Sequence, residues 1–394
     1  MPSPRRSFLQ NAGAFGAFAP LSTAAAAKPA RDFLKELGVR PIVNAAGSYT
    51  MFTGSLMNPE CVKAIAAMSH RFVRIVELHD AVGKRIAQML NVEAAMVPSG
   101  AAAGLTLGTA AVLTGGQPEF IARIPDLTGM KSEVLIQKSH RFPYDHMVRN
   151  CGVKLMEIET REELERAITP QTAMLLFLNK ADHLGQIQMK EWVELGRKHK
   201  LPTFNDAAAD VPPLENLARP IQLGFDLIAV SGGKAIRGPQ SAGLLLGRAD
   251  LIRAARLNTV PYSDTMGRSC KVNKEELVGM MVALEQFLQR DHAADYREWE
   301  RSIELIDKAI RALAGVKTEK FVPKIANQCP HLRITLSKPE MTAEHLMQKL
   351  RDGEPSIELV PGPELKGSVE VASWTLEKGE AEIVAARLRA LLSA

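Results

Sequence analysis

Three short segments of the chain carry residue types that could act together in one reaction. The first is Ser-Gly-Gly-Lys at residues 231–234, which directly follows the apolar run 227–230, a pattern typical of a buried strand. A lysine amine at the carboxyl end of such a strand, here Lys234, can attack a carbonyl carbon when burial or a nearby positive charge keeps it reactive. The two glycines leave room for a ligand beside the backbone. A surface lysine in a glycine turn is the alternative interpretation of this segment taken alone.

The second segment contains Asp206, which ends the strand candidate 202–205 and precedes Lys234 by 28 residues. That spacing corresponds to one β-α-β step, so both side chains are expected at the carboxyl edge of the sheet, where ligands bind in such folds. A carboxylate that faces a pyridine nitrogen keeps this nitrogen protonated, and Ala207 or Ala208 could pack on a ring face. A helix cap is the alternative role for an aspartate after a strand.

The third segment is Ser99-Gly100-Ala101, which follows the strand candidate 94–97 and begins a helix. Backbone N–H groups and the positive end of the helix form an anion site there, although plain capping is also common for a serine-glycine turn. Ser231 is a candidate second hydroxyl donor to the same anion. A lysine nucleophile, an acid for a ring nitrogen and a phosphate cup together meet the requirements of pyridoxal phosphate, so the sequence predicts this cofactor.

The elements that position these residues follow from the hydrophobic pattern. From about residue 93, short apolar runs alternate with longer amphipathic ones, which indicates β-α units around a mostly parallel sheet. Strands are expected at 94–97, 134–137, 154–158, 173–178, 202–205, 227–230 and 242–246, with helices at 101–113, 144–150, 161–168, 190–200 and 249–257. After residue 268 a long charged helix is expected over 274–313, followed by shorter elements at 332–336, 343–350, 357–359, 368–371 and 381–392. The sequence therefore predicts an α/β fold with a large seven-stranded domain over 61–268 and a smaller α+β domain over 269–394.

These segments resemble pyridoxal-phosphate enzymes of fold type I, the aspartate aminotransferase superfamily. Within it they are similar to the branch that contains selenocysteine synthase (L-seryl-tRNA selenium transferase) and D-glucosaminate-6-phosphate ammonia-lyase. The matching segments are 40–47, 99–102, 140–146, 206–208, 231–234 with 238–240, and 267–276, and the resemblance extends from about residue 31 to the C-terminus. It implies a homodimer or a higher homo-oligomer with active sites shared between subunits.

Two residues of the matched segment 140–146 are candidates for catalysis and substrate binding. His140 could stack on the cofactor or transfer protons, and Arg141 could bind a substrate carboxylate. A capped helix and a surface salt bridge are the alternatives for this pair. His146 lies six residues after His140, which does not match a helical metal pair, so no metal site is predicted.

Three further residues are candidates for the substrate side of the site. Arg268 is a cation next to a matched segment and could contact a substrate or remain at the solvated surface. Asn44 and Tyr49 lie in a loop that the resemblance alone places at the substrate mouth.

The N-terminus carries an export-like pattern. Residues 3–10 read Ser-Pro-Arg-Arg-Ser-Phe-Leu-Gln, and a weakly apolar run then ends in four alanines at 24–27, which resembles a twin-arginine signal. We expect a signal peptide over 1–27, an N-terminal arm over 28–60 and a periplasmic protein, or a cytoplasmic one if the signal is not used. An ordinary basic N-terminus before an amphipathic helix is the alternative.

Composition limits the remaining classes. The 394 residues include 49 Lys+Arg and 44 Asp+Glu, and the net charge of +5 is too small to suggest a nucleic-acid partner. With 46% hydrophobic and 24% charged residues the chain is typical of a folded globular protein, and no run is a good membrane span. Cys61, Cys151, Cys270 and Cys329 form no C-x-x-C pair and are interpreted as mostly buried free thiols.

Together these residues predict a lyase of the ammonia-lyase or dehydratase type. Once a substrate amine displaces Lys234 to form an external aldimine, the freed lysine is the natural base for removal of the α-proton, and loss of a β-hydroxyl and hydrolysis would release ammonia and a keto acid. The expected substrate is a small hydroxylated amino acid or amino-sugar acid. A racemase, an aldolase and a transferase of the selenocysteine-synthase type use the same carbanion and remain alternatives, although an export signal argues against a tRNA substrate. An exported binding protein with a degenerate fold is the alternative outside the enzymes.

Overall fold

The computed structural model describes residues 31–338, 340–362, 365 and 367–393. The predicted signal peptide over 1–27 lies outside the described residues. Of the described residues, 31–41 belong to one unit and those from Ile42 onward to another. In the first unit a short helix, α1 (Phe33–Leu37), begins after Asp32, whose side chain accepts a hydrogen bond from the Lys35 N–H, and ends at the left-handed Gly38.

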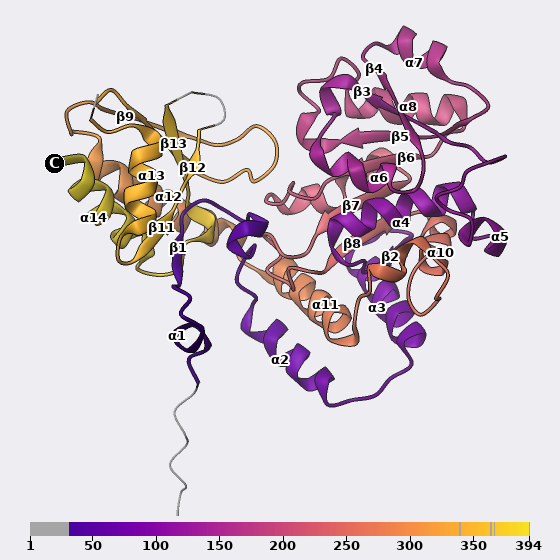
Figure 1. The fold of residues 1–394 in the computed structure, drawn as a ribbon, viewed down its shortest axis with the longest axis horizontal. Helices are drawn as coiled ribbons and strands as arrows, with labels where there is room; N and C mark the ends of the chain where they lie inside the picture. Colours follow the sequence, from indigo (N-terminus) through magenta and orange to yellow (C-terminus); the bar gives the residue numbers. More distant parts are fainter. Residues whose placement is uncertain (1–30, 339, 363–364, 366, 394) are drawn as a thin grey trace, which may run out of the picture. The chain divides into compact units, whose positions relative to one another are not determined.

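A seven-stranded sheet forms the centre of the second unit (Figure 1). In spatial order its strands are β2 (Ala94–Met96), β8 (Gly243–Gly247), β7 (Leu227–Ser231), β6 (Thr203–Asp206), β5 (Thr172–Leu178), β3 (Glu133–Gln137) and β4 (Lys154–Ile158). Strand β8 runs antiparallel to both of its neighbours, β2 and β7, and all other neighbours in the sheet are parallel. The prediction of a mostly parallel seven-stranded sheet is therefore confirmed, and each predicted strand range overlaps an observed strand.

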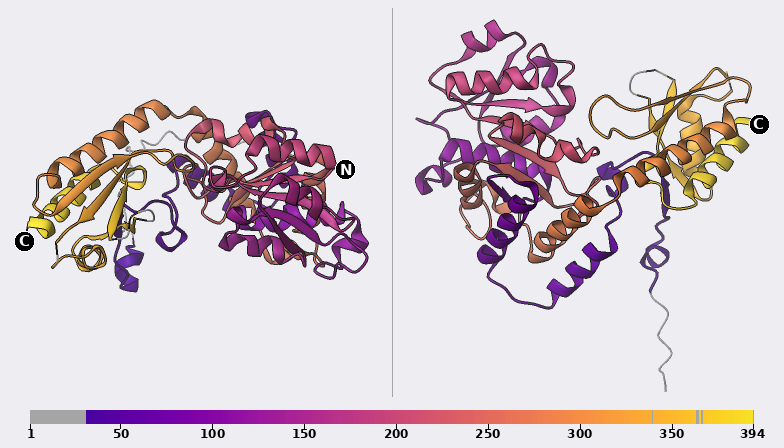
Figure 2. Two further views of the ribbon diagram at one scale, coloured as in Figure 1. Left: turned by 90° about the horizontal axis from the view of Figure 1, so that it is seen from above. Right: turned by 180° about the vertical axis from the view of Figure 1, so that it is seen from behind.

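Helices cover both faces of this sheet (Figures 1 and 2). The helices of this part of the chain are α2 (Pro59–Ser69), which packs on α11, α3 (Ile75–Leu90), α4 (Gly100–Thr114), α5 (Pro118–Ile121), α6 (His146–Arg149), α7 (Arg161–Ala167), α8 (Met189–His199), α9 (Arg219–Leu223), α10 (Ala249–Leu257) and α11 (Lys274–Gln289). Short 3-10 helices connect them at η1 (Thr50–Phe52), η2 (Lys138–His140), η3 (Pro143–Asp145), η4 (Asn179–Ala181), η5 (Leu214–Leu217) and η6 (Met266–Ser269), and a seventh, η7 (Ser373–Thr375), follows β13.

The strand sequences explain this arrangement. Every residue of β5 (TAMLLFL) and of β8 (GLLLG) is buried, which is expected when apolar layers cover both sheet faces. Neighbouring residues of a strand enter opposite layers: Leu175 packs with Trp192 of α8, whereas Met174 packs with the side chains of α4. Helix α4 is apolar on nearly all sides and is buried along most of its length, so its N-terminus is firmly held.

A second sheet of four antiparallel strands has the order β12 (Val360–Pro361), β13 (Ser368–Ala372), β10 (His331–Leu336) and β9 (Val316–Phe321). Its apolar core includes residues of the helices α12 (His292–Ile310), α13 (Ala343–Asp352) and α14 (Glu380–Ser393). Strand β1 (Ile42–Asn44) pairs in parallel with β11 (Ser356–Glu358), so residues near the N-terminus share this C-terminal core.

The prediction of one long helix over 274–313 is wrong. Helix α11 ends at Gln289 and α12 begins at His292, because the Asp291 side chain accepts a hydrogen bond from the Ala294 N–H and starts a new helix. Strand β9, whose sequence VKTEKF is apolar only at its two ends, was not predicted as an element.

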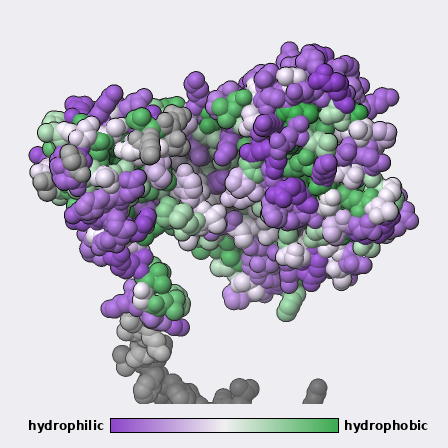
Figure 3. Space-filling view, turned by 45° about the horizontal axis from the view of Figure 1, so that its top comes forward, coloured by the Kyte–Doolittle hydropathy of each residue, from purple (hydrophilic) through white to green (hydrophobic). Residues whose placement is uncertain are grey.

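The surface is mixed in polarity. Polar side chains cover most of the face in Figure 3, with smaller apolar groups between them. Most of the exposed large apolar side chains of the described chain lie between residues 33 and 73. Within the same described residues, no helix combines the length and the apolar character needed to cross a membrane. Three of the four cysteines are buried and Cys270 is half-buried, and all are free thiols, as predicted.

Candidate active site

The carboxyl ends of the parallel strands bring the predicted residues to one edge of the large sheet. Strand β6 ends at Asp206, and its neighbour β7 leads into the segment that contains Lys234. Strand β2 leads to Ser99 and has the same direction as β7, because both are antiparallel to β8. The three predicted segments therefore lie at the same edge, where ligands bind in open α/β sheets.

The Lys234 side chain is half-buried, and its Nζ makes no hydrogen bond or ion pair with any other described residue. Burial lowers the pKa of this amine, and the charge of Lys180 acts in the same direction, while Asp206 and Asp210 oppose the shift. A lysine with a lowered pKa and no committed partner is suited to attack a carbonyl group.

The backbone around Lys234 is held by an N-terminal segment. The Ser55 N–H donates to the Gly233 carbonyl oxygen at 3.1 Å, and the Ser55 hydroxyl donates to the Lys234 carbonyl oxygen at 2.6 Å. Gly54 adopts φ +75°, and a Cβ there would lie 2.6 Å from the Gly233 oxygen. This close approach requires a glycine.

The glycines before Lys234 also meet a packing requirement. A Cβ on Gly232 would lie 2.2 Å from Sδ of Met280, and a Cβ on Gly233 would lie 2.4 Å from Cα of Gln240. Both glycines are thus required by packing against α11 and the following loop, and the room they leave for a ligand stays a prediction.

Asp206 is buried, with 5% of its surface exposed. Its Oδ1 accepts a hydrogen bond from the Ala208 N–H at 2.9 Å, and no donor from the described chain reaches its other oxygen. Burial raises the pKa of this carboxyl, opposed by the Ala208 N–H and by the charges of Lys234 and Lys180. No helix begins here, so the helix-cap alternative is wrong, and the second oxygen is suited to accept the N–H of a pyridinium ring.

The predicted phosphate cup lies at the start of α4. The Ser99 side chain makes no capping hydrogen bond, and Gly100 adopts φ +77°. A Cβ on Gly243 of β8 would lie 2.9 Å from the Ala101 nitrogen, so this glycine allows the helix start to approach the sheet closely. Ser231, the second hydroxyl candidate, pairs with Gly243 at the end of β7 and is half-buried.

His79 of α3 supports this cup and was not found from the sequence. Its Nε2 accepts a hydrogen bond from the Val97 N–H at 3.1 Å, two residues before Ser99. Burial and the charge of Arg256 lower the pKa of His79 to about 3, so the ring is neutral and can accept this bond. A histidine on an amphipathic helix gives no sequence signal of this contact.

His140 is completely buried. Its Nδ1 accepts a hydrogen bond from the Leu178 N–H at 3.3 Å, Nε2 lies 3.2 Å from Nε2 of Gln137, and the ring packs edge-on against Phe177 at 4.4 Å. Burial lowers its pKa to about 4. The ring nitrogens are thus occupied by protein contacts, and the predicted roles in stacking and proton transfer remain predictions.

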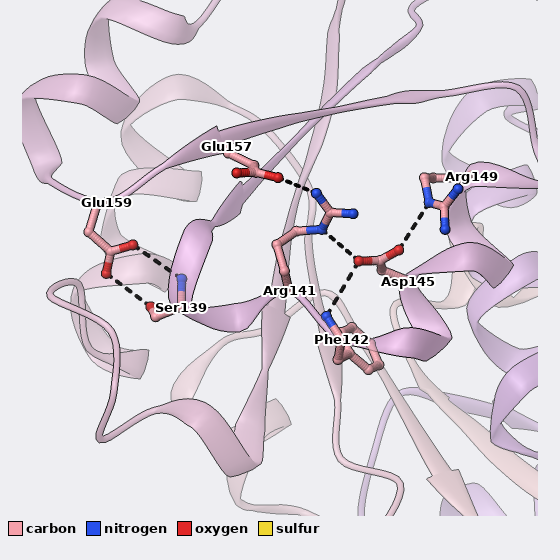
Figure 4. Close-up of polar contacts among 7 residues, drawn as sticks. All are labelled: Ser139, Arg141, Phe142, Asp145, Arg149, Glu157 and Glu159. Carbon is pink, nitrogen blue, oxygen red and sulfur yellow. Dashed lines mark hydrogen bonds and ion pairs between the residues drawn. The ribbon is translucent and has the colours of Figure 1, made fainter.

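Arg141 is held by two carboxylates (Figure 4). Its Nε donates to Asp145 at 2.6 Å, and Nη1 pairs with Glu157 of β4. Arg149 donates to the other oxygen of Asp145 at 3.0 Å. The surface salt-bridge alternative describes these contacts, and a substrate carboxylate would have to compete with both acids for Arg141.

The other substrate candidates lie in different surroundings. The Asn44 side chain folds its own loop: Oδ1 accepts from the Ala46 and Gly47 N–H groups, and Nδ2 donates to the Gly47 oxygen. Tyr49 is 49% exposed, and Arg268 is exposed in η6. The structure therefore gives Asn44 a role in shaping the loop and leaves Tyr49 and Arg268 accessible.

Two charged residues of this edge were missed by the sequence analysis. Lys180 lies in η4, which directly follows β5, and is exposed, whereas Asp210 is 2% exposed, and the charges of both act on Lys234 and Asp206. The rule that strand ends gather at one edge could have identified Lys180. Nothing in the local pattern indicates that Asp210, four residues after Asp206, is buried.

The fold and this site define a pyridoxal-phosphate-dependent enzyme of fold type I. An unpaired, half-buried lysine, a buried acid with an unused oxygen and an open helix N-terminus fit this cofactor. The chain matches the family described as SelA: L-seryl-tRNA selenium transferase over residues 73–329, and it belongs to this family.

Several relatives are known by name. D-glucosaminate-6-phosphate ammonia lyase of Salmonella typhimurium (strain 14028s / SGSC 2262) is 28% identical over 372 residues, covering 91% of this chain and 97% of that protein. A solved structure of a D-glucosaminate-6-phosphate ammonia-lyase superimposes with a TM-score of 0.78 at 27% identity, covering 92% of this chain and 98% of that one. The 5'-C-glycyluridine monooxygenase-decarboxylase of a Streptomyces species is 28% identical over 376 residues, covering 91% of each chain. The L-seryl-tRNA(Sec) selenium transferase of Aquifex aeolicus (strain VF5) is 22% identical over 263 residues, covering 57% of this chain and 56% of that protein.

Proposed function

We propose that this protein is a pyridoxal-phosphate-dependent lyase of the ammonia-lyase type that acts on a small hydroxylated amino acid or amino-sugar acid. The observation that carries the proposal is the pair formed by the unpaired Lys234 amine and the buried Asp206 carboxylate at adjacent strand ends. Similarity to an ammonia lyase over nearly the whole length of both chains supports this reaction class.

The residues proposed to hold the cofactor each supply one contact. Lys234 forms the covalent link, Asp206 accepts the ring N–H, and Ala208, half-buried two residues further on, packs against the ring. The N–H groups of Gly100 and Ala101, with the hydroxyls of Ser99 and Ser231, bind the phosphate. When bound, the cofactor supplies an electron-accepting ring that stabilises negative charge at the substrate α-carbon.

Lys234 also serves as the base in this proposal. Because burial lowers the pKa of the amine, a larger fraction is neutral near neutral pH than for an exposed lysine, and a neutral Nζ can take the α-proton. Asp206 keeps its negative charge next to the ring nitrogen only while a positive group faces it, since burial disfavours the carboxylate. His140, Arg141, Asn44, Tyr49 and Arg268 are the proposed lining of the substrate side.

The experiment that tests this function uses the purified full chain. We expect a yellow protein, borohydride trapping of the cofactor on Lys234 by peptide mass spectrometry, and loss of the adduct in Lys234→Ala but not in Lys308→Ala, an exposed lysine on α12. A panel of amino acids and amino-sugar acids should then yield ammonia and a keto acid for at least one compound. A folded, colourless protein would instead indicate a binding protein.

A second reaction is favoured by a specific observation. The family match is to the selenium transferases, so a transferase of this type is the runner-up. Since a relative of equal identity is named a monooxygenase-decarboxylase, oxygen consumption and carbon dioxide release belong in the same assay. Substrate turnover with either signature and no ammonia would contradict the lyase proposal.

We also propose that the chain assembles as a homodimer or higher homo-oligomer. Support comes from large apolar side chains that are exposed within one stretch of the second unit: Tyr49, Met51, Leu56, Met57, Val62, Phe72 and Val73. A second copy of the chain would bury them. Light scattering should report a dimer or larger species, and Phe72→Asp should shift it toward the monomer.

Export and domain division are further proposals. Residues 1–27 would direct the folded protein through the twin-arginine route to the periplasm, followed by an arm over 28–60, a large domain over 61–268 and a small domain over 269–394. The sequence pattern of residues 3–10 supports the export proposal. Replacing Arg5 and Arg6 together with Lys should leave the protein in the cytoplasmic fraction.

A further inference from the structure

Arg237 combines an unusual backbone conformation with a side chain that the proposed function does not use. It lies three residues after Lys234, and its φ of +58° is in the left-handed region. Glycine is favoured there, because the Cβ of any other residue is crowded by the backbone. A residue with a long side chain keeps this conformation only when the surrounding contacts compensate the strain. The contacts of Arg237 therefore require an explanation.

The backbone of Arg237 closes the turn that carries Lys234. The Arg237 N–H donates to the Lys234 carbonyl oxygen at 2.9 Å, and the Gly238 N–H donates to the Gly232 carbonyl oxygen at 2.9 Å. The Arg237 carbonyl oxygen accepts a hydrogen bond at 3.1 Å from the N–H of Asn58, the residue that caps the start of α2. These bonds use main-chain atoms alone, so a glycine at position 237 would retain them.

The side chain of Arg237 joins this turn to two distant segments. Its Nε donates to the Leu56 carbonyl oxygen at 2.8 Å, and its Nη2 donates to Oε1 of Glu377 at 3.0 Å. Leu56 follows Ser55, whose hydroxyl binds the Lys234 carbonyl oxygen. Glu377 lies between η7 and α14 in the C-terminal part of the chain. One guanidinium thus connects the Lys234 turn to residues 181 and 140 positions away.

Both acceptors of Arg237 belong to segments with further hydrogen bonds of their own. Close to Glu377, the Thr375 hydroxyl donates to the Asn44 carbonyl oxygen at 2.9 Å. A guanidinium presents several donors in a rigid plane, so it can serve two acceptors at once, which a lysine ammonium on a flexible stem does less well. The Arg237 and Glu377 side chains are 25% and 48% exposed, so breaking this pair leaves no buried, uncompensated charge.

We propose that Arg237 is a positioning residue for Lys234. Its guanidinium holds the turn against the segment 55–58 and against Glu377, which restricts the positions from which the Lys234 amine meets a carbonyl group. Such restriction speeds a reaction because less orientational freedom is lost when the reacting atoms meet. The inference rests on the proposed role of Lys234 as the reactive lysine.

The experiment measures how fast Lys234 captures pyridoxal phosphate in the full chain stripped of cofactor. In this capture Nζ forms a double bond to the carbonyl carbon, and the carbonyl oxygen leaves as water with both protons of the neutral amine. Stopped-flow absorbance follows the rate, and borohydride trapping with peptide mass spectrometry identifies the modified lysine.

Arg237→Gly retains the left-handed backbone and removes both side-chain contacts. We expect this variant to capture the cofactor about tenfold more slowly, as the loss of charge-assisted hydrogen bonds suggests. Lys200→Gly is the matched control: Lys200 is an exposed cation with φ +55° at the end of α8. It should capture the cofactor at the wild-type rate.

Stability separates positioning from a merely structural role. Arg237→Gly loses two partly exposed contacts but relieves the left-handed strain, so its midpoint of chemical denaturation should stay close to the wild-type value. With substrate, kcat should fall while KM changes little, because Arg237 does not contact the substrate in this proposal. Arg237→Lys keeps the charge without the planar group and should capture the cofactor at an intermediate rate.

Glu377→Ala tests the same contact from the other side and leaves position 237 unchanged. Capture should be about threefold slower in this variant, because a partly exposed ion pair contributes little free energy. A wild-type capture rate in a folded Arg237→Gly would overturn the proposal, and if that variant does not fold, a wild-type rate in Glu377→Ala would do so. Slower capture by Arg237→Gly together with a failed lyase assay would overturn the proposed function alone.

Discussion

Ser55 and Lys234 are 179 positions apart in the chain, yet the Ser55 hydroxyl donates a 2.6 Å hydrogen bond to the Lys234 carbonyl oxygen. This bond joins the segment before α2 to the loop that carries the reactive lysine. It acts on the backbone of Lys234, so the side chain stays available for chemistry.

Ser55→Ala should loosen this loop. A hydrogen bond of this kind contributes about 1 kcal/mol, so we expect roughly fivefold weaker retention of the cofactor with a modest loss of stability. Dialysis followed by absorbance measures the retention. Ser69→Ala removes a comparable hydroxyl bond on the exposed end of α2 and should retain the cofactor like the wild type.

Gly54→Ala should be more damaging than its backbone angle alone explains. Gly54 and Gly129 have nearly the same φ, +75° and +76°, but a Cβ on Gly54 would strike the Gly233 oxygen at 2.6 Å, whereas a Cβ on Gly129 meets nothing within 4 Å. Both alanine variants carry the left-handed strain, and Gly54→Ala adds a clash of about 2 kcal/mol. Chemical denaturation measures the difference, and equal losses in the two variants would disprove the packing argument.

His79 should make the protein sensitive to acid. Its pKa is about 3 in the folded protein and near the ordinary histidine value of 6.5 in the unfolded chain, so between these pH values the unfolded chain binds one more proton than the folded one. The contribution of His79 to the free energy of unfolding is fully present above the pKa of the unfolded chain. It falls by about 1.4 kcal/mol per pH unit as the pH decreases between the unfolded and the folded pKa.

His79→Gln retains an acceptor for the Val97 N–H and removes the titrating group. Denaturation from pH 7 to pH 4 should show a shallower slope for this variant, by roughly one proton. His345→Gln, an exposed histidine of α13, is the control and should keep the wild-type slope. A wild-type slope in His79→Gln would show that the ring does not stay neutral.

Arg141→Met separates a structural from a substrate-binding role. Burial by itself would raise the pKa of Asp145, but hydrogen bonds from Arg141 and Arg149 outweigh it, and the net pKa is lowered. We expect Arg141→Met to lower the free energy of unfolding by about 1 kcal/mol. The double variant that combines Arg141→Met with Asp145→Asn should lose less than the sum of the two single losses, because the two side chains contact each other. Because Arg141 belongs to the proposed lining of the substrate side, KM for the substrate should rise about tenfold or more, and an unchanged KM would limit Arg141 to the structural role.

Local sequence patterns predicted the elements that are buried on both faces. The apolar run of β5 is typical of a strand inside a sheet that is covered on both faces, so the sequence predicted the length and position of this strand. The positions of Lys234 and Asp206 followed from the same patterns, because residues after parallel strands gather at one edge. The break between α11 and α12 was not predicted, because it depends on the side chain of Asp291 capping a new helix in a region of continuous helical pattern.

The sequence alone determined the fold class and the cofactor, and it placed the proposed lysine and acid at one edge of the sheet, since strand periodicity and residue type are local properties. Only the tertiary structure decided the pairing of β1 with β11 and the burial of Asp210. The same holds for the hydrogen bond from the Ser55 hydroxyl to the Lys234 carbonyl oxygen and for the one from the Val97 N–H to His79. These contacts join residues far apart in the chain, or depend on how completely distant segments exclude water. Their free energy comes from packing and desolvation, which no local pattern of residues encodes.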